Sequence, residues 1–304
     1  MTSGQGRGGA PMKAAEELGS SLEVLNPPNA VARATKLWEA EKSRQRHQSK
    51  PLPSTVAQLP LWADALRCLP NEIFRSALFN ARNRNQARAY LKQSEITVIG
   101  EGRITFTGEE LRQDDETVWL QLIHIAKELP LGQTVEFTPY SLCKAIRWPI
   151  DGSSYTRLRG CLDRMQATSL AVVSKRLKEG VSISMIPIFK WKDNETGRAL
   201  RLYRVQVAPQ LMDLFGDVHY TYLEWEQRLA LPVGIATWLH GYLASHRQPY
   251  PIKIDTIKNG AGMTTERTAK GRELVEKALQ ELMIVGFLAS WEIVGELIHV
   301  KRKF

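Results

Sequence analysis

The sequence predicts an α+β protein with two tandem winged-helix domains, each a helix-turn-helix closed by a β-hairpin wing, behind a flexible N-terminal tail. One pattern occurs twice, in residues 137–188 and 250–300: a short amphipathic helix, a polar turn, a longer helix with basic residues, and a hairpin. The chain of 304 residues is long enough for two domains, each with its own core. A helix-turn-helix with a hairpin wing is typical of proteins that bind duplex DNA.

The long helices of the two copies share one register. Four apolar residues in each fall at i, i+3, i+4 and i+7: Leu158, Cys161, Leu162 and Met165, then Val275, Ala278, Leu279 and Leu282. The two stripes are 117 residues apart (275 − 158 = 117), and the same offset relates Leu170 to Phe287, at the ends of the two helices. This spacing places the four residues of each copy on one helical face, which we expect to be buried.

We expect four segments along the chain. Residues 1–54 begin with a glycine-rich stretch and end in a proline-rich one, which predicts a flexible tail. Residues 55–63 are a linker, residues 64–216 the first winged-helix domain, and residues 217–304 the second.

The local patterns predict the elements of both domains. In the first we expect a short helix within 69–79, strands within 95–107, a helix at 114–128, the two helices of the motif at 138–146 and 155–168, a wing at 170–188, and a hairpin turning at 193–197. In the second we expect helices at 232–245, 252–258 and 265–283 and a wing at 285–300 that turns at Gly295 and Glu296.

Two charged clusters in the first domain each have two interpretations. Asp114, Asp115 and Glu116 suit the positive end of a helix dipole, which explains them more simply than a metal site does. The basic run in residues 82–92 is open between an arm along a DNA backbone and a solvated loop.

The composition indicates a polyanionic partner and a reducing compartment. The net charge is +9 and the pI is about 9.5, which favours nucleic acid, although ribosomal or membrane-surface roles also fit the charge. The three cysteines have no zinc spacing, and their odd number argues against a disulfide framework. We find no membrane span and no signal pattern, so we expect a cytoplasmic protein.

The longer helix of the first copy, predicted at 155–168, is the candidate recognition helix. Polar residues on its face opposite the apolar stripe predict a DNA contact. They are Ser153, Thr156, Arg157 and Arg164, and Gly160 on the same face permits close approach. Arg159 is expected to flank the groove, and the wing tip adds Lys175, Arg176 and Lys178. Arginine donates to guanine or phosphate in pairs of hydrogen bonds, and hydroxyls serve as donor or acceptor. Arg157 and Arg164 are expected to be the principal contacts. The alternative is a surface helix with an ordinary basic face.

The second unit has a more mixed candidate surface. Its predicted DNA contacts are Arg267, Lys270 and Lys277 on the long helix, and Lys301 near the chain end. Acidic residues lie among them, so the two units differ in their exposed faces although they share a core register.

A short motif lies in the linker. Gln58, Leu59, Leu61 and Trp62 have the form of the pentapeptide by which bacterial proteins bind the sliding clamp of DNA polymerase. In that mode an extended peptide makes a polar contact through its amide while leucine and an aromatic ring fill an apolar groove. The alternative is that the same apolar residues anchor the linker to the domain.

Signatures of enzymes are absent from the sequence. It lacks a Gly-x-x-x-x-Gly-Lys-Ser/Thr loop, which argues against an ATP-driven helicase. No His-x-His pair accompanies a tyrosine nucleophile, as a nicking enzyme would need to hold its metal. We therefore expect no catalytic residue, no metal and no cofactor. A nicking or priming enzyme remains a third hypothesis, testable on supercoiled DNA.

Several segments, spread in order along residues 58–302, resemble TrfA-type plasmid replication initiator proteins. They are Arg75-Ser76-Ala77-Leu78-Phe79, Thr107-Gly108-Glu109-Glu110-Leu111-Arg112 with Asp114-Asp115-Glu116, Gln166-Ala167-Thr168, and Ser245-His246-Arg247-Gln248-Pro249-Tyr250-Pro251.

The resemblance implies an initiator that binds direct repeats, called iterons, at a plasmid origin. Such proteins help to melt the adjacent AT-rich DNA, contact its single strand, and recruit the host's DnaA, replicative helicase and β sliding clamp. The family's clamp-binding segment falls at residues 58–62, where Pro60 and Trp62 replace the usual serine and phenylalanine. The resemblance also implies a homodimer in equilibrium with a monomer, which limits replication and so controls copy number. The alternative function is a two-domain winged-helix transcriptional repressor.

Overall fold

The structure is a computed structural model that describes residues 58–100, 102–130, 132–173, 181–192, 195, 199–210, 214–215, 219–265 and 267–303. Residues 56–304 form one compact unit, and every contact described below lies within it. The predicted wing-tip contacts Lys175, Arg176 and Lys178 lie outside the described residues.

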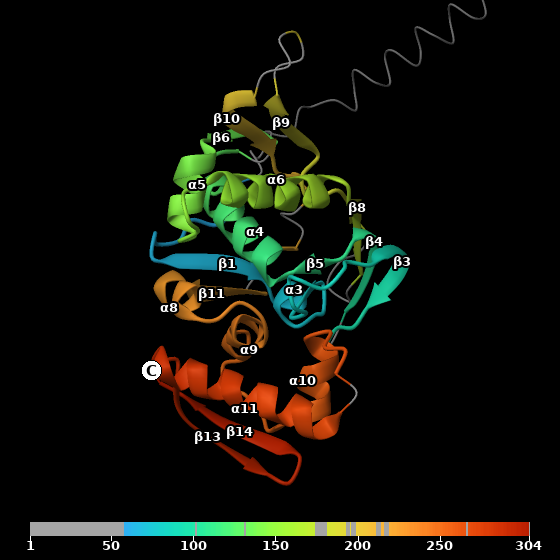
Figure 1. Ribbon diagram of the computed structural model, residues 1–304, viewed down its shortest axis with the longest axis vertical. Coiled ribbons are helices and arrows are strands. Elements are labelled where there is room, and N and C mark those ends of the chain that lie inside the picture. Colours follow the sequence, from blue (N-terminus) through green and yellow to red (C-terminus); the bar gives the residue numbers. More distant parts are fainter. Residues whose placement is uncertain are drawn as a thin grey trace, which may run out of the picture. The chain divides into compact units, whose positions relative to one another are not determined.

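Helices and strands are interspersed along the chain (Figure 1). In order they are β1 (Leu66–Pro70), α3 (Asn71–Phe74), β2 (Phe79–Asn80), β3 (Tyr90–Ile96), β4 (Arg103–Glu109), β5 (Leu111–Arg112), α4 (Gln113–Ala126), β6 (Thr134–Phe137), α5 (Pro139–Ala145), α6 (Gly152–Gln166), β7 (Ser169–Val173), β8 (Val181–Ile183), β9 (Ile188–Lys192), β10 (Ala199–Gln206), β11 (Tyr220–Glu224), α8 (Trp225–Ala230), α9 (Ile235–Ala244), β12 (Ile252–Lys253), α10 (Ile254–Gly260), α11 (Thr268–Ile284), β13 (Leu288–Val294) and β14 (Leu297–Arg302). The mixed α+β class predicted from the sequence is confirmed.

The first helix–hairpin unit consists of α5, α6 and the antiparallel strands β7 and β8. α5 begins after Thr138, whose hydroxyl accepts a hydrogen bond of 2.9 Å from the backbone N–H of Ser141. α6 begins after Asp151, whose carboxylate accepts one of 2.7 Å from the N–H of Ser154. The cap of α6 is therefore Asp151. β7 also pairs with β4, in a sheet of order β3-β4-β7-β8.

The second helix–hairpin unit consists of α10, α11 and the strands β13 and β14. The hairpin turns at Gly295 and Glu296, as predicted, and Gly295 has a φ of +63°, a conformation that glycine adopts without strain. β12 pairs with β14 at the far edge, so this sheet has the order β12-β14-β13.

The eight stripe residues of the two long helices are buried, as their spacing predicted. Those of α6 belong to one hydrophobic core and those of α11 to a second. We expected the second domain to begin at residue 217. However, β11 pairs with β1, and Trp225 at the start of α8 packs in the first core, so the first core extends to Trp225 and the second begins at Leu231.

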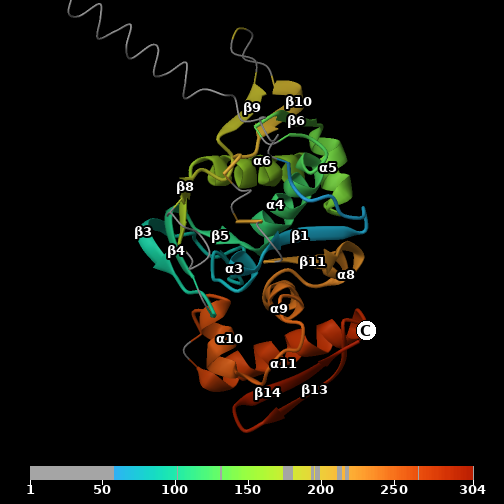
Figure 2. The ribbon, with the colours of Figure 1, turned by 180° about the vertical axis from the view of Figure 1, so that it is seen from behind.

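The helices between the two cores connect them. α9 lies between the β1–β11 pair and α11, and this arrangement is visible from both sides (Figures 1 and 2). The indole N–H of Trp238 on α9 donates to the carbonyl of Ser76, at 2.9 Å. The buried Arg228 of α8 donates to Glu116 on α4, at 2.8 Å, and to the carbonyl of Thr237 on α9, at 3.0 Å. Helices α4, α8 and α9 are therefore joined by buried polar contacts.

Within the described ranges, no helix is long and apolar enough to cross a membrane.

Candidate nucleic-acid interface

The N-terminus of α4 contains three buried acidic residues, Asp114, Asp115 and Glu116. One oxygen of Asp115 accepts a hydrogen bond from the backbone N–H of Arg112, at 2.8 Å, so this carboxylate caps the helix from its third position. Burying an unpaired carboxylate costs several kcal/mol of folding free energy, so such groups require cationic partners.

The partners of two of these acids are arginines that the sequence had indicated as DNA contacts. Arg157 donates through Nε and Nη2 to Asp114, at 3.3 and 3.2 Å. Arg164 donates through the same two nitrogens to Asp115, at 3.1 and 2.7 Å. Arg88, which precedes β3, donates to Asp115 Oδ2 at 2.6 Å, the oxygen that also accepts from the Arg112 N–H, and to Asp114 at 3.2 Å. The acidic residues at the start of α4 therefore bind α6 through ion pairs, in addition to suiting the positive end of the α4 dipole.

These ion pairs fix the charge state of their members. Burial by itself would raise the pKa of Asp114, but Arg157, Arg88 and Arg164 outweigh it, and the pKa lies below its ordinary value. Burial would lower the pKa of Arg164, but Asp115 more than offsets it, and the pKa is raised. The Asp114 carboxylate and the Arg164 guanidinium therefore remain charged near neutral pH.

A cavity of about 610 Å³ lies along α6 where these arginines emerge. Its lining residues are Arg84, Asn85, Arg88, Asp114, Pro149, Ser153, Ser154, Thr156, Arg157, Gly160 and Arg164. Four arginines against one aspartate give it a positive lining. Ser153 and Thr156 are exposed at its border. The structure thus brings four predicted contacts together, namely Ser153, Thr156, Arg157 and Arg164.

Arg159 lies away from this cavity. Its guanidinium carbon is 3.2 Å from the centroid of the Trp191 ring, and its Nε is 3.5 Å from a carboxylate oxygen of Asp163. Arg159 therefore packs toward β9, on another side of α6.

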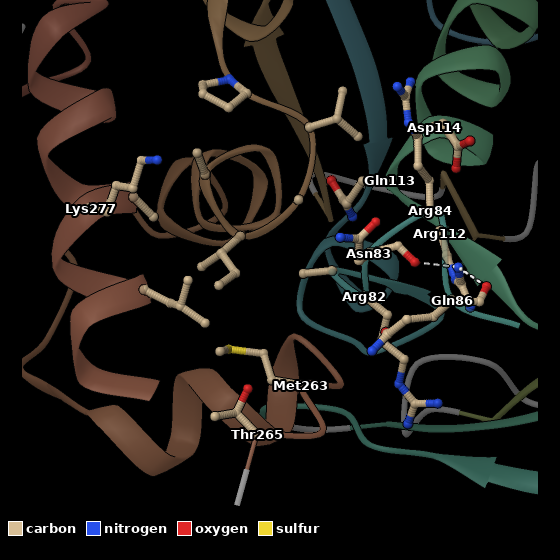
Figure 3. Close-up of a pocket in the computed structure, with 18 of the residues that line it drawn as sticks. Arg82, Asn83, Arg84, Gln86, Arg112, Gln113, Asp114, Met263, Thr265 and Lys277 are labelled. Carbon is tan, nitrogen blue, oxygen red and sulfur yellow. Dashed lines mark hydrogen bonds between the residues drawn. The ribbon is translucent and has the colours of Figure 1, made fainter. Parts of the chain in front are cut away.

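A second cavity, of about 640 Å³, lies where the second unit meets the residues after β2 (Figure 3). Lys277 of α11 stands on one side, and Arg82, Asn83 and Arg84 stand on the other. Among the other predicted contacts of this unit, Lys270 pairs with Glu273 at 2.8 Å, and Arg267 is exposed at the start of α11. Lys301 is exposed on β14 and lines neither cavity.

Our site prediction did not include the residues between β2 and β3. Arg84, Asn85 and Arg88 line the cavity along α6, although they lie far from that helix in the sequence. The basic run was the available signal, and the spacing of its charges does not reveal which helix it meets.

The linker motif packs against the folded chain. Leu59 is 2% exposed and Trp62 is also buried, whereas Leu61 is 69% exposed. The Gln58 side-chain amide donates to the carbonyl of Lys127 at 3.2 Å, and the Lys127 ammonium donates to the carbonyl of Trp62 at 2.8 Å. The anchoring that we gave as the alternative for this motif is therefore present.

An aromatic contact completes the anchoring. The indole N–H of Trp62 donates to Nδ1 of His124, near the end of α4, at 3.2 Å. Burial, with the nearby charges of Arg67 and Lys127, lowers the pKa of His124 to about 4. The imidazole is therefore neutral near pH 7 and able to accept this hydrogen bond.

In the part of the chain that the structure describes, no group of three or more histidines, cysteines or acids is arranged to hold a metal ion. Cys68, Cys143 and Cys161 are buried, free thiols.

Comparisons with known proteins agree with one another. A model of the TrfA protein family matches residues 30–302. The chain is 35% identical over 259 residues to the plasmid replication initiator protein TrfA of Escherichia coli, a match that covers 84% of this chain and 67% of that protein. A crystal structure of domains 2 and 3 of RctB has a TM-score of 0.52 at 12% identity, covering 77% of this chain and 99% of its own. A second structure of those domains has a TM-score of 0.51 at 12% identity, covering 77% and 97%. The RctB structures show a likeness of fold alone. The family match and the identity to TrfA are more specific, and the chain therefore belongs to the TrfA family of plasmid replication initiator proteins.

Proposed function

We propose that this protein initiates plasmid replication by binding duplex iterons at the origin through two winged-helix units. Membership in the TrfA family supports this function. The observation that supports it most directly is the cavity along α6, where four arginines and two exposed hydroxyl side chains gather beside one aspartate. Such a lining suits phosphate and base edges, because arginine and hydroxyl groups contact both.

The ion pairs to α4 leave the arginines able to bind DNA. A guanidinium has five N–H groups, and Arg157 uses Nε and Nη2 for Asp114, so Nη1 remains available. Its guanidinium also lies 3.8 Å from the centroid of the Trp148 ring, which fixes its plane. Asp114 therefore orients Arg157, so that less conformational entropy is lost when it meets DNA.

The test measures binding of an origin repeat and of a scrambled duplex by fluorescence anisotropy. Arg157→Ala alone would remove one of the two cationic partners of the buried Asp114 and leave only Arg88, so the comparison is between Asp114→Asn and the double variant with Arg157→Ala. If Arg157 contacts a base, the double variant binds the repeat about 1 to 3 kcal/mol more weakly than Asp114→Asn does. Wild-type protein that binds both duplexes equally would contradict iteron recognition.

Two further measurements define the mode of binding. If the site neutralises about six phosphates, the logarithm of the affinity falls with the logarithm of the salt concentration at a slope of about −5. Footprinting on the plasmid's own origin is expected to show evenly spaced protected repeats. Protection of a single operator near a promoter would instead favour the transcriptional repressor.

The proposal includes the later steps of initiation. The bound protein promotes melting of AT-rich DNA, binds its single strand and recruits host DnaA, the replicative helicase and the β sliding clamp, in the bacterial cytoplasm. A monomer–homodimer equilibrium limits initiation. The protein itself makes and breaks no covalent bond, so supercoiled origin DNA incubated with magnesium stays unnicked; nicked circles or new primers would contradict this part.

Clamp binding would use residues 58–62, and the structure sharpens its test. The exposed Leu61 is free to be replaced without disturbing the core, whereas Trp62 is not. We expect Leu61→Ala to abolish capture of the clamp while the unfolding midpoint stays unchanged. Because Gln58 and Trp62 are hydrogen-bonded to α4 residues, the clamp must compete with these contacts. Lys127→Ala, which removes a contact to Trp62, is expected to raise clamp affinity.

A further inference from the structure

We infer that one DNA duplex crosses both helix–hairpin units over the loop of residues 81–88, and that Arg84 contacts a backbone phosphate at the crossing. The inference rests on the proposed function, since it concerns the same duplex. It adds a contact from a segment outside both helix-turn-helix motifs.

The position of Arg84 is the first reason. The two cavities share two lining residues, Arg84 and Asp114, and of these Arg84 is exposed whereas Asp114 is buried. One cavity continues to Ser153 and Thr156 on α6, and the other continues to Lys277 on α11. Arg84 therefore stands between the polar surfaces of the two units, where a duplex that touched both would pass.

The charge of Arg84 is the second reason, because the other arginines nearby are each paired with a carboxylate. Arg82 pairs with Glu110 at 2.5 Å, and Arg112 pairs with the same carboxylate at 3.1 Å. Arg88 pairs with Asp115 at 2.6 Å. Within the described ranges, Arg84 makes no hydrogen bond and no ion pair. It therefore presents a full positive charge to solvent, which a phosphate would neutralise.

The loop that holds Arg84 is fixed from beneath. The buried guanidinium of Arg112 donates to three loop carbonyls, those of Asn83 at 2.5 Å, Gln86 at 2.9 Å and Ala87 at 2.9 Å. Figure 3 shows the first two of these contacts. The side-chain oxygen of Asn83 also accepts from the backbone N–H of Asn85, at 2.9 Å. Because its backbone is held in this way, the loop loses little entropy when it binds.

The same loop is joined to the second unit. The backbone N–H of Ala81 donates to the carbonyl of Ala261 at 2.8 Å, and Arg82 Nε donates to the carbonyl of Gly262 at 2.9 Å. Both acceptors follow α10. The loop is thus anchored through Arg112 to β5 and through residues 261 and 262 to the second unit. Its Arg88 also pairs with Asp115, which holds Arg164 of the first unit, so the loop spaces the two units along a ligand.

The lining of the cavities favours a duplex backbone over a single strand. Sites for single-stranded DNA combine positive charge with aromatic rings on which bases stack. No aromatic residue is among those that line either cavity. Positive charge with hydroxyl and amide groups is the pattern of backbone contacts that position a duplex without reading its sequence.

The experiment compares Arg84→Ala with wild type on a repeat duplex, a scrambled duplex and a single strand of the repeat. Affinity for both duplexes is expected to fall about fivefold at 0.15 M salt. One phosphate contact contributes about −0.9 to the slope of log affinity against log salt concentration, which amounts to about fivefold between 1 M and 0.15 M salt. The salt slope should become shallower by about 0.9. Arg84→Lys should retain most of the affinity.

The matched control is Arg103→Ala. Arg103 is an exposed arginine of β4 that pairs with Glu95 and lines neither cavity, and its loss should leave both duplex affinities unchanged. The unfolding midpoint of each variant shows that the fold is intact.

Three outcomes for Arg84→Ala would overturn the inference. The first is unchanged duplex affinity and salt slope. The second is a loss of affinity confined to the repeat duplex, which would mean a base contact, and the third is a loss of affinity confined to the single strand. The first outcome leaves the proposed function standing if Thr156→Ala and Lys277→Ala still weaken repeat binding. Failure of wild-type protein to prefer the repeat is a separate result, and it would contradict the proposed function itself.

Discussion

At the scale of single residues, the arginines of α6 serve the fold as well as the candidate interface. Arg164 is the more buried of the two, with its side chain 16% exposed against 26% for Arg157, and its partner Asp115 is fully buried. Removing one member of a buried ion pair leaves the other unpaired, which costs more than the pair contributes. A loss of DNA binding on substitution of Arg164 is therefore informative only alongside a measurement of stability.

We expect Arg164→Ala to lower the free energy of unfolding by about 3 kcal/mol or more, because the Asp115 carboxylate would keep fewer cationic partners. Chemical denaturation followed by tryptophan fluorescence measures the effect. Lys270→Ala, which removes an exposed ion pair with Glu273, is the control, and we expect a change of less than about 1 kcal/mol. Equal unfolding midpoints for the two variants would show that Asp115 does not depend on Arg164.

His124 is expected to make stability depend on pH. Its pKa of about 4 in the folded protein lies below the ordinary value of 6.5, so the unfolded chain binds the proton more readily. Stability is therefore insensitive to this group above pH 6.5 and falls as the pH drops from 6.5 toward 4, by up to about 1.4 kcal/mol per pH unit.

His124→Gln keeps an acceptor for the Trp62 indole and removes the titration. Chemical denaturation of both proteins at several pH values should show a shallower decline for this variant between pH 6.5 and pH 4. Parallel curves would contradict the assignment.

At the scale of secondary structure, local periodicity was sufficient to predict the helices. α4, α5, α6, α9, α10 and α11 lie within a few residues of their predicted ranges because an apolar stripe at helical spacing needs no distant partner to be recognised. The β1–β11 pair was missed, because its partners Leu66 and Glu224 are 158 residues apart in the sequence (224 − 66 = 158). In the sheet of order β6-β10-β9, the β9–β10 hairpin corresponds to the predicted one, but the pairing of β10 with β6 was missed for the same reason.

The candidate interface was predictable only in part, for a related reason. Ser153, Thr156, Arg157 and Arg164 were found because they share one face of one helix. Their pairing with the start of α4 was not found, since the sequence shows which residues are charged but not which charges meet. The acidic cluster was attributed to the helix dipole, while its main partners come from α6 and from the loop before β3.

We attribute the conformation of the loop of residues 81–88 mainly to the side chain of Arg112. Lysine lacks the planar fork of arginine, so Arg112→Lys should lose contacts to the carbonyls of Asn83, Gln86 or Ala87. We expect faster amide hydrogen exchange in residues 83–87, measured by mass spectrometry, with little change in α11. Unaltered exchange in this loop would mean that other contacts hold it.

At the scale of the whole molecule, the two cores are not independent. Ile99, which follows β3, packs against the second core, and Gly260 at the end of α10 lies close to it. A Cβ at position 260 would fall 2.3 Å from the Ile99 side chain and 2.9 Å from the Trp238 ring. Close packing of this kind holds α10 against the first part of the chain.

Gly260→Ala is therefore expected to destabilise the protein by about 1 to 3 kcal/mol through overpacking. The control is Gly152→Ala at the start of α6, where an added Cβ would meet nothing within 4 Å. Thermal unfolding compares the two variants. A Gly260→Ala protein as stable as wild type would show that the contact between α10 and Ile99 yields easily.

The buried carboxylates at the start of α4 also constrain how relatives of this protein diverge. A replacement of Arg164 that keeps Asp115 removes one of the two cationic partners of a buried carboxylate, and the reverse leaves the mostly buried Arg164 guanidinium without its partner, so we expect either change alone to be destabilising. Among homologous initiators we expect positions 115 and 164 to change together, and likewise positions 114 and 157. We then expect substitutions to be rarer at the arginines of α6 than at the exposed hydroxyl residues beside them. New DNA specificities would arise first at Ser153 and Thr156.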